Sequence, residues 1–380
     1  MNYTNIASIL NNAIMKNFVG NTTTIAENLG NIVELGTLVS DLTADQMKSF
    51  NNDLIVGVHN YVISRLYESK RFRILKDAQE YGGAIQRIMA TDNFVAQDSH
   101  LLNLVSDGST SYFDGKYYGM SLSSRVYTDT KAFKVVHSVS DDTISQLFTT
   151  AQGVADYFGL LEETEKNTIT MELEALEKAV INKAIVETIA DGRVINLLTA
   201  FNTYVGQSYT LTQIRANRDL VAYFGSFCKS LLAQLVDYIK SPSKKYNDGT
   251  VLTFSPANKI EVELLTQFAT DIEYIGNPIE PNPAVMVSFD TIPAWQNAGT
   301  DMLPSLAIAS TITTTNGSTT SSVDNVVGFI YDVDGLGITT KRNKIGVEPV
   351  GAESFTNYHH HIANNYFVDK RLPSVALVLE

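Results

Sequence analysis

Apolar residues recur at steps of three or four from Leu160 to Gly192, in a stretch without proline. This spacing matches the 3.6-residue period of an α-helix and predicts one long helix with a single apolar stripe, ended by a C-cap at Gly192. No catalytic group is assigned to the stripe, which favours a structural role. The stripe comprises Ile169, Leu173, Leu176, Val180 and Ala184, widened by Ile181, Ile185 and Ile189, and the acidic residues expected in the first turns are Glu162, Glu163 and Glu165.

The part of the chain before Tyr67 also has helical patterns. A short amphipathic segment spans Ile6 to Ile14, and Thr43 and Gln46 have the spacing of a capping box that opens a longer helix. The apolar face expected for that helix carries Met47, Phe50, Leu54, Val58 and Val62.

Three further helices are predicted. One covers Thr143–Tyr157, with Ser140 to Asp142 as its cap and Gly159 separating it from the long helix. The other two cover Arg215–Ile239 and Asn258–Thr270.

Strand patterns are scattered between these helices. Asn316-Gly317 is a strong hairpin signal, and it lies between Leu306–Thr315 and Ser321–Val333. Helices and strands are mixed without a regular βαβ alternation, so the predicted class is α+β. The other expected strands are Ala84–Ala90, Ala132–Ser138, Val251–Ser255, Ile272–Ile275 and Ala284–Phe289.

The stretch from Glu68 to Thr130 holds few apolar residues for a core of its own. The turn pairs Asp107-Gly108 and Asp114-Gly115 flank a Tyr- and Ser-rich segment within it. We therefore expect a long extended segment without a core of its own, which packs on another part of the protein or on a neighbouring subunit.

Composition narrows the function classes. The 380 residues are 44% hydrophobic and 18% charged, with a net charge of −13, which argues against nucleic-acid binding through charge neutralisation. The single cysteine, Cys228, has no internal disulfide partner and is expected in the core. Met1–Val19 lacks the pattern of a signal peptide, and no apolar window is long enough to predict a membrane span.

A search for reactive groups yields two weak metal candidates and no catalytic residue. His359 and His361 would face the same side of a strand and could share a metal ion, although packing and solvent contact explain them as well. Asp332 to Gly337 is similar to a calcium loop, but its glycine comes too early and Asn343 occupies the position of the bidentate glutamate. We therefore predict no catalytic residue, no cofactor and no metal, and read Trp295 as a core anchor.

The C-terminal segment carries a resemblance to a known family. It contains Asn364-Asn365-Tyr366-Phe367 and closes with the apolar run Ser374 to Leu379. This arrangement resembles the end of major capsid proteins of tailed bacteriophages, which have the HK97-like fold.

The resemblance implies an order of parts along the chain. The long helix becomes the spine helix of a peripheral domain. The implied parts are an N-terminal arm (1–67), an extended β-loop or E-loop (68–130), a peripheral domain with the spine helix (131–199), an axial domain (200–344) and a return to the peripheral domain (345–380).

The function implied is that of a virion capsid protein, assembled in the host cytoplasm and not an enzyme. Subunits would self-assemble as a homo-oligomer of pentamers and hexamers into an icosahedral shell around double-stranded DNA. A portal and packaged DNA are implied partners. A separate scaffolding protein is implied as well, because no scaffold-like segment precedes the arm in this sequence. Some family members also cross-link a lysine to an asparagine, for which Lys70, Lys76 or Lys116 and Asn364 or Asn365 are candidates.

Other interpretations stay open. An encapsulin-type protein shell shares the fold, and a phage neck, tail or adhesion protein would share the Thr- and Ser-rich hairpins. A metal-dependent enzyme centred on His359 and His361 is the alternative from a different class.

Overall fold

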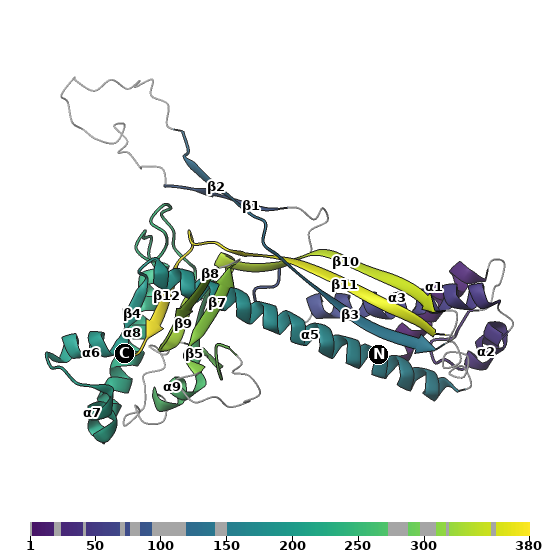
Figure 1. The fold of residues 1–380 in the computed structure, drawn as a ribbon, viewed down its shortest axis with the longest axis horizontal. Helices are drawn as coiled ribbons and strands as arrows, with labels where there is room; N and C mark the ends of the chain where they lie inside the picture. The colour runs from purple at the N-terminus through teal and green to yellow at the C-terminus, as the bar shows by residue number, and fades with distance from the viewer. Residues whose placement is uncertain are drawn as a thin grey trace, which may run out of the picture. The chain divides into compact units, whose positions relative to one another are not determined.

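The computed structural model describes residues 2–18, 24–40, 43–68, 73–76, 84–92, 119–140, 150–272, 288–296, 309–316, 319–350 and 355–380. The chain divides into two compact units, each assembled from three separate segments. Figure 1 labels the helices and strands of both. Unit 1 contains Met1–Gly83, Asp129–Glu177 and Ile338–Tyr366, and unit 2 contains Ala84–Thr128, Lys178–Gly337 and Phe367–Glu380.

Unit 1 begins with three helices: α1 (Tyr3–Asn17), α2 (Ile32–Ser40) and α3 (Ala44–Glu68). The predicted capping box is confirmed, because Thr43 N donates to Gln46 Oε1 (3.1 Å) and Gln46 N donates to Thr43 Oγ1 (3.4 Å). The predicted apolar face of α3 is largely confirmed, since Phe50, Leu54, Val58 and Val62 are all buried, and α3 packs against α1.

A three-stranded sheet completes unit 1. Its strands are β3 (Thr130–Ser140), β10 (Leu336–Val350) and β11 (Phe355–Val368), in the order β10-β11-β3. β11 and β3 are antiparallel. Alternate residues of β11 point into the core, and these are Tyr358, His360, Ile362 and Asn364. The unit therefore has helices packed on a sheet, with one shared apolar core.

The long helix, α5 (Ala151–Ala190), supplies part of its residues to each unit. In unit 1 its Val154, Phe158, Ile169 and Leu173 join the core cluster. The predicted helix is confirmed at its C-terminal end, where Gly192 has a φ of 76°. The predicted break at Gly159 is wrong: the helix passes through it, and a Cβ added there would meet nothing within 4 Å. Residues 141–149, where part of the preceding helix was predicted, lie outside the described residues.

Unit 2 is built on a five-stranded sheet with the strand order β4-β12-β9-β5-β6. Its central strand, β9 (Val326–Asp332), is buried along its whole length and pairs antiparallel with both of its neighbours. Because both faces of β9 are covered, its sequence is a nearly continuous apolar run and does not alternate between apolar and polar residues. The other strands are β4 (Val194–Asn196), β12 (Ser374–Val378), β5 (Ile260–Leu265) and β6 (Asp290–Ile292).

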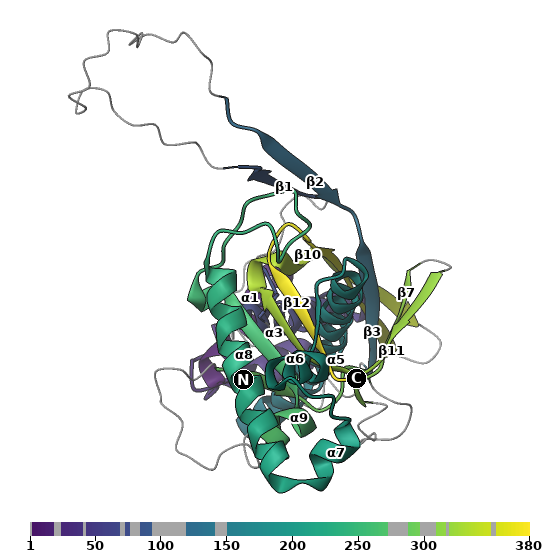
Figure 2. The ribbon, with the colours of Figure 1, turned by 90° about the vertical axis from the view of Figure 1, so that its left-hand side faces the viewer.

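Helices α6 (Leu197–Val205) and α7 (Leu211–Ala216) pack against α8 (Arg218–Lys240) within unit 2 (Figure 2). The prediction of one helix over Arg215–Ile239 is largely confirmed, although Asn217 divides it by capping α8 through its side chain. Cys228 is buried on α8, as predicted. No helix among the described residues is long and apolar enough to span a bilayer.

The helix predicted over Asn258–Thr270 is wrong. The structure has a short 3₁₀ turn at Ala257–Lys259, then β5, then α9 (Thr266–Thr270). The sequence Ile-Glu-Val-Glu-Leu-Leu alternates apolar and polar residues over its first five positions, which is the two-residue period of a strand, and it pairs with β9. The strand predicted at Val251–Ser255 is reduced to a single bridge between Ser243 and Thr253.

A hairpin at the predicted place is confirmed, because β7 (Ile312–Asn316) and β8 (Thr319–Val323) pair antiparallel with Asn316 opposite Thr319; residues 317 and 318 lie outside the described residues. Its second strand ends earlier than predicted, because Asn325 adopts a φ of 60° and the chain then enters the five-stranded sheet as β9. Trp295 is a buried anchor, as predicted, and its Nε1–H donates to Val326 O (2.8 Å). The strands predicted within 272–289 fall almost wholly outside the described residues.

Replacing Ile169 by Ala tests the contribution of α5 to the core of unit 1. Ile169 is 0% exposed, so its truncation should lower the free energy of unfolding by about 3 kcal/mol. Urea denaturation followed by circular dichroism measures the change. Met171→Ala is the matched control on the same helix, because Met171 is 70% exposed and should change stability by less than about 0.5 kcal/mol. Equal effects of the two variants would contradict the burial of the stripe.

Candidate functional site

The β1–β2 hairpin of unit 2 falls within the predicted extended loop (68–130), of which residues 68, 73–76, 84–92 and 119–130 are described. β1 (Ile85–Ala90) and β2 (Leu122–Tyr127) pair antiparallel, from Ile85 opposite Tyr127 to Ala90 opposite Leu122. The strand predicted at Ala84–Ala90 is thus confirmed. A two-stranded hairpin is marginally stable on its own in water, so other contacts must hold it in place.

The two faces of this hairpin have different environments. One face, which we call the outer face, is exposed, and three of its six side chains are large and apolar: Ile88 (57% exposed), Leu122 (57%) and Val126 (59%). The opposite side, the inner face, is buried or half-buried. The outer face consists of Gln86, Ile88, Ala90, Leu122, Ser124 and Val126, and the inner face of Ile85, Arg87, Met89, Ser123, Arg125 and Tyr127.

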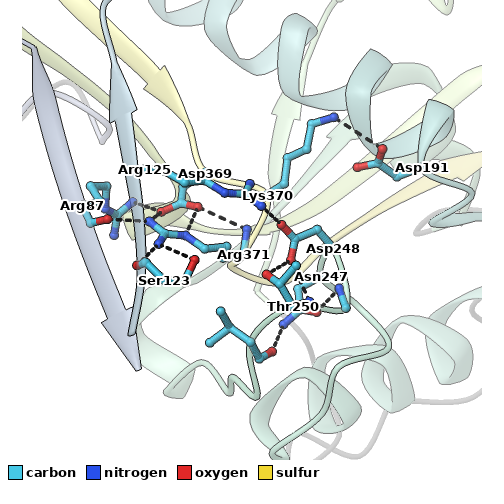
Figure 3. A network of polar contacts seen from close by, with 12 residues as sticks. Arg87, Ser123, Arg125, Asp191, Asn247, Asp248, Thr250, Asp369, Lys370 and Arg371 are labelled. Atoms are coloured by element: carbon cyan, nitrogen blue, oxygen red, sulfur yellow. Dashed lines mark hydrogen bonds and ion pairs between the residues drawn. The ribbon is translucent and has the colours of Figure 1, made fainter. Parts of the chain in front are cut away.

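Arg371 anchors both strands from the turn between β11 and β12 (Figure 3). Its guanidinium donates to Ser123 O (2.6 Å) and Ser123 Oγ (3.3 Å) on β2, and to Arg87 O (3.1 Å) on β1. It also donates to both carboxylate oxygens of Asp369, at 2.9 and 2.8 Å. These contacts use all the N–H groups that an arginine side chain offers. Both side chains of the pair are fully buried.

Two arginines on the inner face reach back toward the rest of unit 2. The Arg87 side chain donates to Asp334 O, lies 3.4 Å from Asp369 Oδ2, and stacks over the Phe367 ring at 4.9 Å. Arg125 pairs with the Asp248 carboxylate. The hairpin is therefore tied to unit 2 at several points, which involve both of its strands.

The loop that carries Asp248 is itself held in place. Asp248 N donates to Lys370 O (2.9 Å), and its carboxylate accepts from Thr250 N (3.0 Å). Asn247 Nδ2 donates to Val251 O (2.6 Å) and Thr253 Oγ1 (2.8 Å), while Lys370 Nζ donates to Asp191 Oδ1 (3.4 Å; Figure 3). The anchor therefore rests on a rigid framework. We call Arg87, Arg125, Asp248, Asp369 and Arg371 the hairpin anchor.

The electrostatics of the hairpin anchor favour the charged forms. Burial alone would raise the pKa of Asp369, but the hydrogen bond from Arg371 and the charges of Arg87 and Arg371 outweigh it and lower that pKa. Burial and the negative charge of Asp369 raise the pKa of Tyr127 to about 12. The carboxylate of Asp369 is therefore ionised at neutral pH.

His359 and His361, the weak metal candidate of the sequence, do not gather with further ligands among the residues that the structure describes. Both rings lie on the same side of β11, as predicted, with centroids 6.3 Å apart. His359 Nε2 lies 3.2 Å from Glu348 Oε2, and His361 is exposed. The segment similar to a calcium loop forms a 3₁₀ turn at Val333–Gly335, consistent with the simpler reading of it as a turn between strands.

The middle histidine of the triplet has a different environment. His360 points into the core of unit 1, where it meets His59 of α3 and Glu165 of α5. Burial, and then the neighbouring His59 and His137, lower the pKa of His360 to about 3. Glu165 lies four residues before Ile169, so it continues the apolar stripe of α5. The stripe thus includes a buried carboxyl group that its apolar residues did not reveal, and the predicted placement of Glu162, Glu163 and Glu165 in the first turns is wrong because α5 begins at Ala151.

Comparisons with known proteins give matches to solved structures. No family model matches the sequence, and no curated protein does. The capsid structure of Staphylococcus phage Andhra matches with a TM-score of 0.49 and 12% identity, over 82% of this chain and 84% of that chain. The capsid structure of cyanophage P-SCSP1u gives 0.42 and 9%, over 80% and 86%. The mature capsid of bacteriophage PhiM1 gives 0.39 and 9%, over 80% and 85%.

Replacing Asp369 by Asn tests the hairpin anchor. The variant keeps the shape of the side chain but leaves the buried Arg371 guanidinium without its counter-charge, which should lower the free energy of unfolding by about 3 kcal/mol. Hydrogen exchange of the β1 and β2 amides should accelerate as well. Asp237→Asn is the control, because Asp237 forms an ion pair with Lys240 while 73% exposed, and its loss should cost less than about 1 kcal/mol. Unchanged exchange in β1 and β2 would contradict an anchoring role.

The contribution of Asp369 should depend on pH. Because its pKa is lowered in the folded chain, the stabilisation is present above the unfolded value of about 3.9 and is lost as pH falls through the lower folded value. The stability difference between the parent chain and Asp369→Asn should thus be constant from pH 7 to 5 and shrink below about pH 4. Urea titrations at each pH measure it, with Ile169→Ala as a variant whose effect should not change. A difference that stays constant into acid would contradict the charged pair.

Proposed function

We propose that this chain is the major capsid protein of a tailed bacteriophage, with the HK97-like fold and a structural rather than an enzymatic role. The observation that carries the proposal is the two-sided β1–β2 hairpin. One face is fixed to unit 2 by the hairpin anchor, while the other presents Ile88, Leu122 and Val126 to solvent. Such a hairpin suits a segment that is held firmly at its base and covers a neighbouring subunit.

Energetics support this role for the outer face. Burying a Val, Leu or Ile side chain contributes roughly 1.5–3 kcal/mol relative to its exposed state. Three such side chains on one face would therefore favour contact between subunits at each of many repeated sites in a shell. Exposed apolar side chains gathered on one strand pair are typical of an interaction surface.

The order of elements along the chain supports the same proposal. N-terminal helices come first, followed by the β1–β2 hairpin, the long helix α5 with the β3 strand before it, the five-stranded sheet of unit 2 and a return through β11 and β12. We assign these to an N-terminal arm (1–67), an extended loop (68–130), a peripheral domain (131–199 and 345–380) and an axial domain (200–344). The axial domain would form the centres of pentamers and hexamers.

The remaining parts of the proposal concern partners. The shell would enclose double-stranded DNA, with a portal and a separate scaffolding protein taking part in assembly in the host cytoplasm. The net charge of −13 suits a container, because an acidic protein does not condense onto the packaged DNA.

Electron microscopy and sedimentation of the full-length protein test the proposal. The parent chain should form closed shells, or rings of five and six subunits. A double variant, Ile88→Ser with Val126→Ser, should fold with an unchanged circular dichroism spectrum but need at least tenfold more protein to assemble, since two buried apolar contacts per subunit are lost. Gln86→Ser, a polar truncation on the same face, is the matched control and should assemble normally.

The outcomes separate the readings. Normal assembly of the double variant would show that the outer face is not an interface. A chain that stays monomeric even when it is co-expressed with the scaffolding and portal proteins of the same phage would contradict the capsid proposal. Shells that enclose a protein cargo and no DNA would favour an encapsulin-type shell.

A further inference from the structure

Three buried side chains of unit 1 bring their ligand atoms together. His59 Nδ1 and His360 Nδ1 lie 2.8 Å apart, His360 Nδ1 lies 3.1 Å from Glu165 Oε1, and His59 Nδ1 also contacts Glu165 Oε1. The two histidine side chains are 0% exposed and the glutamate side chain 3%. The three residues come from α3, α5 and β11, so the tertiary fold rather than local sequence assembles them. We call them the His59–Glu165–His360 cluster.

Protons cannot satisfy all three edges of this triangle while Glu165 is ionised. If both Nδ1 atoms donate to the carboxylate, their two N–H groups face each other at 2.8 Å. If His360 Nδ1 instead donates to His59 Nδ1, then His59 presents a lone pair to the carboxylate. A cation at the centre of the three atoms resolves the conflict, because it accepts a lone pair from each of them at once.

We propose that the His59–Glu165–His360 cluster binds a divalent transition-metal ion, and that zinc fits it best. Two imidazole nitrogens and a carboxylate are a ligand set that zinc accepts, at about 2.0–2.2 Å from each atom. Calcium and magnesium prefer sets made of oxygen, so two nitrogen ligands disfavour them. A small outward rotation of the side chains would bring all three atoms to these distances.

A fourth ligand position is available within the same residues. Glu165 Oε2 is buried and accepts no hydrogen bond from the part of the chain that the structure describes. A buried carboxylate oxygen without a donor is costly, and binding to the ion as a bidentate carboxylate would give it a partner. The cluster can therefore supply four ligand atoms from three side chains.

Neighbouring groups hold the two rings in the orientation that the ion needs. His59 Nε2 lies 2.7 Å from Asn343 Oδ1 of β10, which leaves Nδ1 for the cluster. The His360 ring stacks on His137 of β3 at 4.9 Å, and His137 stacks in turn on Tyr358 at 5.3 Å. The hydrogen bond to Asn343 fixes the tautomer of His59, as outer contacts of metal-binding histidines do, whereas stacking fixes only the direction of the His360 ring, whose Nε2 has no hydrogen-bond partner among the described residues. The ion would join α3, α5 and the sheet of unit 1.

Metal loading of the full-length protein, without a histidine tag, tests the proposal. The protein is stripped with a chelator, dialysed against zinc chloride and freed of excess metal. Elemental analysis should then find one zinc per chain, and in a separate sample of stripped protein the melting temperature should rise by about 3 °C when zinc is added to a hundred times its Kd. Cobalt(II) should give the visible absorption of a four-coordinate ion with nitrogen ligands.

Two variants locate the ion. Glu165→Gln keeps the size of the side chain but removes the charge, and should abolish both stoichiometric zinc and the rise in melting temperature. The double variant His359→Ala with His361→Ala flanks His360 on the opposite side of β11 and should retain both. It therefore controls for zinc bound loosely at the strand surface.

Some results would overturn the proposal. Stripped protein that takes up no stoichiometric zinc or cobalt, with an unchanged melting temperature, would mean that protons alone hold the cluster, with Glu165 neutral. Zinc that persists in Glu165→Gln but disappears in the double variant would place the ion at His359 and His361 instead.

Discussion

The position of the β1–β2 hairpin in unit 2 depends on one buried ion pair that must satisfy many polar groups at once. Removing the Arg371 guanidinium and the Asp369 carboxylate from water is costly, and their mutual attraction compensates only if the remaining N–H groups find acceptors. The carbonyls of Arg87 and Ser123 provide these acceptors. Because each belongs to a different strand, the need to satisfy one side chain fixes both strands of the hairpin.

This requirement explains why a strand pair with little apolar covering can keep one orientation. The strand register fixes where the two main-chain carbonyls that accept from Arg371 lie. A slip of either strand by one residue would move its carbonyl away and leave buried N–H groups of Arg371 without an acceptor. The inner face is thereby specified by hydrogen bonds, while the outer face stays available for apolar contact. A segment of this kind can be aligned before any partner binds, which reduces the ordering cost of association.

The sequence predicted the parts of the fold that depend on local pattern. The α5 stripe, the capping box at Thr43 and the presence of a hairpin formed by β7 and β8 were readable because periodicity, caps and turn residues act over a few positions. The start of α5 was missed because Gly159 looks like a helix breaker, although in an exposed helix it costs only about 1 kcal/mol. β5 was missed although Ile260, Val262 and Leu264 alternate with Glu261 and Glu263, because so short a run does not by itself decide between helix and strand, and the pairing with β9 joins residues far apart in the chain.

The buried polar clusters could not be predicted from single residues, because their members come from elements far apart in the sequence. The two-residue period of a strand places His359 and His361 on one face, which suggested them as a metal pair. The same period places His360 on the opposite, core-facing side with Tyr358 and Ile362. Glu165 likewise falls on the stripe of α5, at a position where an apolar residue is expected. A titratable residue at an apolar position must find a partner across the core, because burying it alone is costly. Titratable residues at apolar positions of different elements are therefore expected to be partners in the core. His59, Glu165 and His360 are an example, because they meet where α3, α5 and β11 pack together.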